Sequence, residues 1–438
     1  MNIIIPENVQ LLMTNLNQGG YQAYVYGACL RDLLLGKQPL NWDVSTDALP
    51  TDVLLLFDEK DGYSAIPDDH DYRSVRVIFQ GESCKISTFQ TAEETRFSGD
   101  IKEDLLHHDF TMNSIAYNNQ QGIVDPFHGV QDIQKQMIRC AGNPFERLQE
   151  DPVRILRAVR FEAQLGFYMD EKLLDAISSS INTLPTSHST QVCNELTQIL
   201  LTQKPSFGIN RLLELGLLRC LIPELIPTVG FDTHSSYHDR DVFKHTMVVL
   251  DQAKAGLNLR LAALFHDIDK PNCLTIDEDG EGHCYGHANS SSEVADSVLS
   301  RLGFDRKTIY SVKAIVKEHM NCYDNISELS IRRLIRRVGL ENLDSLFELQ
   351  IADACGSARS GRNVDRVLAI RSKCWEMVAR REPLSTHDLD IHGYDLMGLG
   401  YPPGKEIGQA LEYLLDKVID NPTLNHKETL MELLKSKD

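Results

Sequence analysis

Apolar and polar positions follow two different patterns along the chain, and the change between them predicts two kinds of structure. Up to about residue 130, short apolar runs bounded by turn residues predict β-strands at 23–26, 73–79 and 84–89. Gly27 directly follows the first run and precedes an apolar stretch at 30–35, which predicts a strand, a glycine turn and a helix. From about Pro152 onward the apolar residues recur at helical spacing. The sequence therefore predicts an α+β protein with a mixed α/β N-terminal part and a helical remainder.

The composition is that of folded domains rather than of a disordered or membrane-spanning chain. Of 438 residues, 42% are hydrophobic and 24% are charged, an ordinary globular mixture with room for about three domains. The net charge of −19 argues against a long basic face for nucleic acid but permits a local basic patch. No segment approaches the ~20 apolar residues of a membrane helix, and residues 1–6 do not resemble a signal peptide. The ten cysteines include no Cys-x-x-Cys pair, so we expect reduced thiols and a cytoplasmic protein.

A glycine turn followed by one aspartate is the first group of residues with candidate chemistry. Gly27 opens a predicted helix, whose N–H groups and positive dipole end attract phosphate. Asn41 and Asp43 are two residues apart, so their side chains would share one face of a strand. Two carboxylates in this arrangement would hold Mg²⁺ ions for nucleotidyl transfer, but only Asp43 is acidic. On these residues alone, a tight turn and a helix cap explain the pattern more simply.

Further motifs extend this pattern in a fixed order. Gly27-Ala28-Cys29-Leu30-Arg31-Asp32 and Asn41-Trp42-Asp43 are followed by motifs at 104–114, 125–129 and 150–161. Together they resemble the polymerase-β-like head of the CCA-adding tRNA nucleotidyltransferase and bacterial poly(A) polymerase family. The resemblance implies catalytic positions at Asp43, Asn41 and Asp109, with Mg²⁺ at Asp43. It also implies that the nucleotide is bound by Gly27, Ala28, Arg31, Asp151, Arg154, Arg157 and Arg160.

The head departs from the family pattern at four places. Asn41 is neutral where the family has its first metal-binding carboxylate, and Lys85 stands where a third acidic residue is expected. Two further replacements are Gln90 for an arginine and His107-His108 for an arginine pair. Because a metal ion stabilises charge that develops in the transition state, we expect weak Mg²⁺ binding and weakened or lost transfer. Asp151 and Arg154 still share one helical face, although a capping aspartate and a solvated arginine are a simpler alternative.

A second group of candidate residues combines histidines and aspartates on predicted helices. His266-Asp267 ends an apolar helix, His245 lies one helix earlier, and Asp353 lies on a later helix. Imidazole and carboxylate ligands suit Mn²⁺, Fe²⁺, Ni²⁺ or Mg²⁺ better than structural zinc. The pattern resembles the HD phosphohydrolase domain, which implies a divalent transition metal such as Mn²⁺ or Ni²⁺ on these four residues. His287 and His319 occupy positions near that metal in related domains, and Asp269 replaces a family glycine and either recruits a second ion or faces solvent.

The resemblance divides the chain into four domains. They are a nucleotidyltransferase head at 1–130, a helical neck for nucleotide recognition and RNA binding at 131–226, an HD domain at 227–385, and a tRNA-contacting helical module at 386–438. The implied enzyme adds C and A to tRNA 3′ ends from CTP and ATP and has no membrane partner. Two alternatives stay open: a metal phosphohydrolase acting on 2′,3′-cyclic phosphates or phosphomonoesters on an RNA-binding scaffold, and a non-catalytic tRNA-binding protein.

Overall fold

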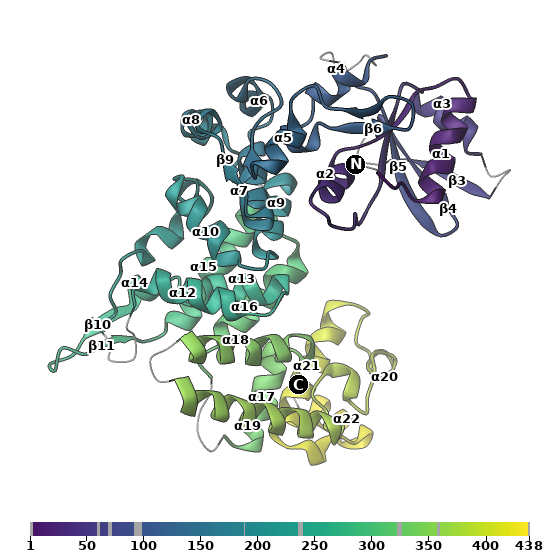
Figure 1. The fold of residues 1–438 in the computed structure, drawn as a ribbon. Coiled ribbons are helices and arrows are strands. Elements are labelled where there is room, and N and C mark those ends of the chain that lie inside the picture. Colours follow the sequence, from purple (N-terminus) through teal and green to yellow (C-terminus); the bar gives the residue numbers. More distant parts are fainter. Residues whose placement is uncertain are drawn as a thin grey trace. The chain divides into compact units, whose positions relative to one another are not determined.

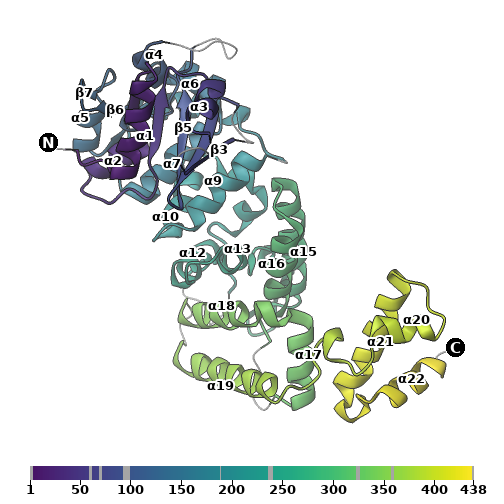
Figure 2. The same cartoon turned by 90° about the vertical axis from the view of Figure 1, so that its right-hand side faces the viewer.

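The computed structural model describes residues 3–58, 62–68, 72–91, 99–187, 189–234, 240–321, 326–356 and 360–436. The chain forms two compact units, Met1–Pro185 and Thr186–Asp438. The first is mixed α/β and the second is largely helical (Figures 1 and 2), which confirms the predicted α+β class. The boundary lies inside the predicted neck, and the division into four domains stays a prediction. No helix among the described residues has both the length and the apolar character needed to cross a membrane.

The first unit is built on a seven-stranded sheet with the strand order β3-β4-β5-β2-β1-β6-β7. The strands are β1 (Ala23–Tyr26), β2 (Asp43–Thr46), β3 (Tyr63–Pro67), β4 (Ser74–Phe79), β5 (Glu82–Thr88), β6 (Ala116–Asn118) and β7 (Gly122–Val124). β2 and β5 run parallel, whereas the other neighbours run antiparallel. The predicted pairing of β4 with β5 is confirmed, and Gln80 and Gly81 make the turn with positive φ.

Side chains along the central strands alternate between the two faces of the sheet. One row of register partners is apolar and almost fully buried: Val25, Val44, Ile86 and Val75. The adjacent row consists of Asp43, Lys85 and Arg76, on β2, β5 and β4. Because a shift of one residue reverses the face, these three charged side chains project from the face opposite to the valines and the isoleucine.

Helices on both sides of the sheet complete the first unit. They are α1 (Glu7–Gln18), α2 (Ala28–Leu34), α3 (Pro50–Leu56), α4 (Ile101–Leu106), α5 (Gly129–Gln134), α6 (Pro144–Glu150), α7 (Arg154–Leu165) and α8 (Glu171–Ser180). Short 3₁₀ turns lie at Thr111–Asn113 and Ile181–Thr183, and β8 (Met137–Ile138) pairs in parallel with β9 (Tyr168–Met169). The predicted strand, glycine turn and helix are β1, Gly27 and α2, which places the glycine at the end of a central strand.

The second unit is a set of packed helices with one hairpin. The helices are α9 (Thr190–Leu200), α10 (Pro205–Glu214), α11 (Leu218–Leu221), α12 (Val242–Gln252), α13 (Leu257–Phe265), α14 (Lys270–Cys273), α15 (His287–Leu302), α16 (Arg306–Glu318), α17 (Glu328–Val338), α18 (Leu343–Gly356), α19 (Ser360–Ala379), α20 (Gly393–Gly398), α21 (Lys405–Asp420) and α22 (Lys427–Lys435). The 3₁₀ turns are Pro223–Thr228, Leu340–Asn342, Thr386–Asp388 and Pro422–Leu424, and β10 (Leu274–Ile276) pairs with β11 (Gly282–Cys284) in a hairpin.

Helix α13 is the centre of the second unit. Every residue from Leu259 to Phe265 is buried, and α12, α15, α16 and α18 all contact this helix. Because α13 is mainly apolar and is buried on all sides, it is stable only when other helices surround it. The chain leaves α13 at His266, so the His266-Asp267 pair lies in the interior of the unit.

Candidate functional site

The first unit contains a pocket of about 280 Å³ where β1 ends and β2 begins. Its lining residues are Tyr26, Gly27, Ala28, Asp43, His107, His108, Asp109, Asn113, Arg154 and Arg157. Gly27 has a φ of 74°, which glycine adopts without strain and which lets the chain turn from β1 into α2. Six of the predicted head residues therefore meet at one pocket. The other four, Arg31, Asn41, Asp151 and Arg160, lie outside its lining.

Asp43 is the first residue of β2 and is half-buried. Burial raises the pKa of its carboxyl group, while the positive charges of Lys85, His108 and Arg76 act in the opposite direction. Asn41 lies before the strand and is exposed, so the two side chains do not share a strand face as the sequence predicted. Asn41 therefore does not join Asp43 in the lining of the pocket.

Asp109, the second carboxylate of the pocket, is held by its neighbours. Its Oδ1 accepts hydrogen bonds from the Phe110 backbone N–H at 2.7 Å and from the Asn113 amide at 2.9 Å. Its Oδ2 lies 3.5 Å from a guanidinium nitrogen of Arg157. Arg31 donates to Asn113 Oδ1 at 2.9 Å, so this buried arginine supports the pocket through Asn113. These contacts engage both oxygens of Asp109.

The arginines of helix α7 make different contacts, and two of them, Arg154 and Arg157, line the pocket. The Arg154 guanidinium donates to the backbone carbonyl groups of Arg147 at 2.8 Å and His107 at 3.3 Å, and it lies 3.2 Å from Glu150. Asp151 accepts a hydrogen bond from the Val153 N–H, which is a capping role, and lies 3.7 Å from Arg157. Of the predicted pair, Asp151 therefore lies before the helix and outside the pocket lining, whereas Arg154 is part of the lining. Arg160 stacks on Phe161 and donates to Gln164.

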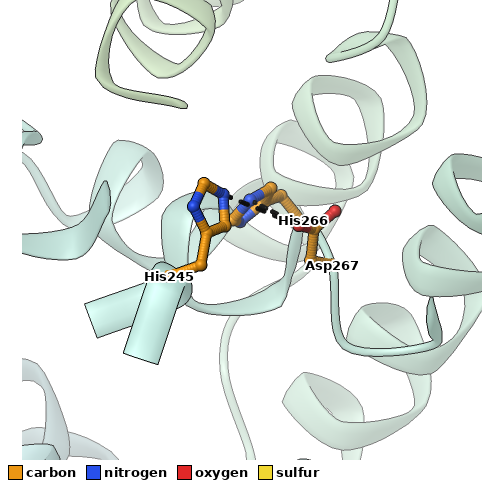
Figure 3. A group of neighbouring side chains, drawn as sticks. All are labelled: His245, His266 and Asp267. Carbon is orange, nitrogen blue, oxygen red and sulfur yellow. Dashed lines mark ion pairs between the residues drawn. The ribbon is translucent and has the colours of Figure 1, made fainter. Parts of the chain in front are cut away.

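Figure 3 shows the side chains of His245, His266 and Asp267 pointing toward one another in the second unit. The Nε2 atoms of His245 and His266 lie 3.7 Å and 3.2 Å from Asp267 Oδ2. Asp353, from α18, accepts a hydrogen bond from His245 Nε2 at 2.9 Å and lies 3.9 Å from His266 Nε2. The structure therefore brings together all four residues that the HD resemblance assigned to a metal.

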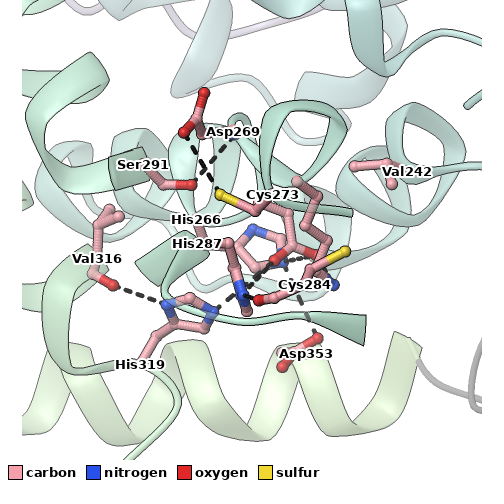
Figure 4. A network of polar contacts seen from close by, with 12 residues as sticks. Val242, His266, Asp269, Cys273, Cys284, His287, Ser291, Val316, His319 and Asp353 are labelled. Atoms are coloured by element: carbon pink, nitrogen blue, oxygen red, sulfur yellow. Dashed lines mark hydrogen bonds and ion pairs between the residues drawn. The ribbon is translucent and has the colours of Figure 1, made fainter. Parts of the chain in front are cut away.

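Three imidazole rings are oriented by the same local contact. The Nδ1 atoms of His266, His287 and His319 lie 2.7–2.8 Å from the carbonyl oxygen three residues earlier in each case. A carbonyl oxygen only accepts, so Nδ1 carries a proton, and in the neutral ring Nε2 is then the atom that offers a lone pair to a metal. All three Nε2 atoms are buried and, within the described residues, make no hydrogen bond. Figure 4 shows these rings gathered around one point, which is the arrangement of histidines that ligate a metal.

Asp267 is the carboxylate that both groups of histidines share. With His245 and His266 it forms one set of candidate metal ligands, and with His287 and His319 it forms a second set. Within each set the ligand atoms lie within 4.8 Å of one another. Asp269 belongs to neither set, and its Oδ1 accepts a hydrogen bond from the Asn272 amide at 2.7 Å.

Lys270 is a contact of this site that the sequence did not assign. Its ammonium lies 2.7 Å from Asp267 Oδ2, and both side chains are buried. Although burial disfavours their charges, His266 and Lys270 hold the pKa of Asp267 well below its usual range, and Asp267 raises the pKa of Lys270. The sequence did contain a signal for this contact. Asp267 and Lys270 are three residues apart, and side chains at this spacing lie on one face of a helical turn. Tyr26 and Asn113 were likewise missed as lining residues of the first pocket.

Comparison with known proteins gives three family models that match in order. They describe a poly(A) polymerase head domain at 23–139, an RNA and SrmB-binding site of polymerase A at 166–228, and tRNA nucleotidyltransferase domain 2 at 286–434. A CC-adding tRNA nucleotidyltransferase of Thermus thermophilus is 30% identical, over 90% of this chain and 89% of the relative. A CCA-adding enzyme of Geobacillus is 34% identical, over 97% and 95%. The chain belongs to the tRNA nucleotidyltransferase family.

The fold agrees with this membership. The crystal structure of the Bacillus stearothermophilus CCA-adding enzyme in complex with CTP matches 99% of both chains with a TM-score of 0.65 at 22% identity. In this tRNA nucleotidyltransferase family member, the glycine turn and the strand that carries Asp43 lie in the N-terminal part that the sequence predicted to be mixed α/β.

Proposed function

We propose that this protein acts on the 3′ end of tRNA and adds nucleotides from CTP or ATP in the pocket of its first unit. The full-length likeness to CC-adding and CCA-adding relatives carries this proposal. The pocket supplies two guanidinium groups, Arg154 and Arg157, which attract a triphosphate. Asp43 is a carboxylate beside that space and would accept a hydrogen bond from the attacking ribose hydroxyl group.

The proposed transfer is weak, because the pocket does not fit a Mg²⁺ ion held by the protein. Mg²⁺ prefers about six oxygen ligands in octahedral geometry. Asp109 uses both of its oxygens in contacts with Phe110, Asn113 and Arg157, which leaves Asp43 as the available carboxylate of the lining. Since a bound metal commonly contributes several kcal/mol of charge stabilisation, we expect a rate several powers of ten below that of a complete site.

The test is incorporation of labelled CTP and ATP into tRNA that lacks part or all of its 3′ CCA end. We expect slow incorporation that Asp43→Asn abolishes. Asp175→Asn, an exposed substitution on α8 of the same unit, is the matched control. Absence of incorporation by the wild type, in protein that binds tRNA, would favour the non-catalytic alternative.

We propose a metal-dependent phosphohydrolase activity of the second unit as a second function. The buried Nε2 atoms of His266, His287 and His319 support it, because within the described residues they make no hydrogen bond, although buried polar atoms are normally hydrogen-bonded. Metal ions at the two candidate ligand sets would satisfy them. These histidines, with His245, Asp267 and Asp353, would hold a divalent transition metal such as Mn²⁺ or Ni²⁺. When bound, such an ion lowers the pKa of water and polarises a phosphate ester.

This second activity is tested with 2′,3′-cyclic nucleotides and phosphomonoesters in the presence of Mn²⁺, Ni²⁺ or Mg²⁺. His266→Ala is expected to abolish hydrolysis, and the matched control variant is His283→Ala, at a half-buried histidine of β11 that contacts Asp277 and belongs to neither candidate ligand set. Hydrolysis that persists in His266→Ala and in Asp267→Ala would assign the activity to another site or to a contaminant.

A further inference from the structure

We propose that Gln350 is a positioning residue of the candidate metal site in the second unit, because its side-chain amide holds the end of the helix that carries His319. The inference rests on the proposed metal-dependent function of this unit. It goes further by naming a residue that supports a candidate ligand from outside the ligand sets. The sequence pattern assigned no role to Gln350.

Gln350 joins two helices through the polar end of its side chain. It lies on α18 and is 4% exposed. Its Nε2 donates hydrogen bonds to the carbonyl oxygens of His319 at 3.0 Å and of Asn321 at 3.3 Å, at the C-terminal end of α16. Because a carbonyl oxygen only accepts, the amide nitrogen must face both of them, and this fixes the orientation of the side chain. Carbonyl groups at the end of a helix lack partners within it, so the amide satisfies groups that would otherwise be unpaired.

Helix α18 contributes to both candidate ligand sets. Gln350 and Asp353 are three residues apart, so their side chains share one face of this helix. Asp353 accepts a hydrogen bond from His245 Nε2 at 2.9 Å, beside the first set. Gln350 holds the main chain of His319, whose Nε2 lies 3.8 Å from Asp267 Oδ1 in the second set. One helix face thus bears a candidate ligand of one set and the support for a ligand of the other.

The other contacts around His319 do different work. The Nδ1 of its ring lies 2.7 Å from the Val316 carbonyl oxygen, which sets the rotation of the ring within its own helical turn. On the preceding residue, Arg337 of α17 donates to the two oxygens of the buried Glu318 at 2.8 and 2.9 Å. The amide of Gln350 ties the His319 main chain to the helix that bears Asp353, and so sets the distance between the two groups of ligands. Loss of a group that orients a metal ligand typically costs about 10–100-fold in metal affinity.

The experiment measures Mn²⁺ binding by calorimetry to the full chain after bound metal has been removed. Gln350→Met keeps the length of the side chain and removes both hydrogen bonds, so it should weaken Mn²⁺ binding on the order of tenfold. Gln350→Asn stays polar but withdraws the amide by one methylene group, and it should weaken binding in the same direction. The matched control is Asn342→Leu, because Asn342 is also a buried amide that donates to a helix-end carbonyl oxygen, that of Val338 at 2.9 Å. This control should lower the thermal transition and leave the Mn²⁺ affinity unchanged.

A double-mutant cycle decides whether Gln350 acts through His319. In the His319→Ala background, Gln350→Met should weaken Mn²⁺ binding no further, because the ligand that it supports is already absent. An equal loss of affinity in both backgrounds, or no loss in the wild-type background, would overturn the inference and leave the proposed metal site in place. Wild-type protein that binds no Mn²⁺ would overturn the proposed metal-dependent function as well.

Discussion

Asp267→Ala should destabilise the metal-free second unit strongly, because it removes the buried carboxylate that lies beside the Lys270 ammonium. Lys270 is 8% exposed and Asp267 is 1% exposed, and their charged atoms are 2.7 Å apart. At an effective dielectric of about 20, the Coulomb energy at this distance is about 6 kcal/mol, which the desolvation of both groups offsets in part. Removal of one partner of a buried pair typically costs about 3–5 kcal/mol.

Differential scanning calorimetry in EDTA measures this loss in the full chain. For a unit of this size, 1 kcal/mol corresponds to roughly 2–4 °C, so the transition of the second unit should fall by about 10 °C. Lys254→Met removes a surface partner of Glu348 and should shift the transition by no more than about 2 °C, since exposed pairs contribute little.

The double variant Asp267→Ala with Lys270→Met decides the cause. If an unpaired buried ammonium produces the loss, Lys270→Met should restore much of it in the Asp267→Ala background, which is strong non-additivity. Losses that simply add would mean that Asp267 acts through packing or through the histidines, and would refute the charge argument.

Three further outcomes follow from the structure. Purified protein should retain transition metal that elemental analysis detects; the metal should be lost in His245→Ala but not in Asp43→Ala, and the opposite result would move it to the head. Burial and the neighbouring His266 lower the pKa of His319 to about 3, so below pH ~6.5 the unfolded chain binds a proton that the folded one excludes. The free energy of unfolding in EDTA should therefore decrease from pH 7 to pH 5, and less steeply in His319→Gln; urea titrations that give the same slope would contradict this. A Cβ at Gly129 would lie 2.0 Å from the Thr111 carbonyl oxygen, so Gly129→Ala should lower head stability by about 3 kcal/mol, and an unchanged urea midpoint would show that the loop shifts freely.

The sequence predicted the parts of the head that depend on neighbours along the chain. The β1–Gly27–α2 turn and the β4–β5 pair depend on glycine and on alternating apolar residues, and both were predicted. The displacement of Asn41 from the strand face was not, because the residue at which β2 begins depends on its partners β1 and β5. Two main-chain carbonyl groups hold the Arg154 guanidinium, and this contact depends on how α6 and the residues around His107 pack against α7. The pattern of residues near Arg154 in the sequence does not predict that packing.

The metal-ligand set of the second unit was predicted from residue types rather than from periodicity. An adjacent His-Asp pair at the end of an apolar helix, with a histidine one helix earlier and an aspartate on a later helix, is specific enough to indicate four ligands. The sharing of Asp267 between two sets of histidines was not predicted, because it requires α15 and α16 to bring His287 and His319 to the same carboxylate. The spacing of these residues along the chain does not determine how close His287 and His319 lie to Asp267 in the fold.

The main-chain support of His266, His287 and His319 bears on how such a site changes over evolution. Ligating histidines are often oriented by a carboxylate, which one nucleotide change can remove. Here the orienting atoms are carbonyl oxygens of Ala263, Cys284 and Val316, and a main-chain carbonyl is retained whatever side chain occupies the position. Substitutions at those three positions therefore leave the tautomers intact as long as the backbone keeps its path. Such an arrangement makes the orientation of the three rings insensitive to side-chain substitutions at the supporting positions.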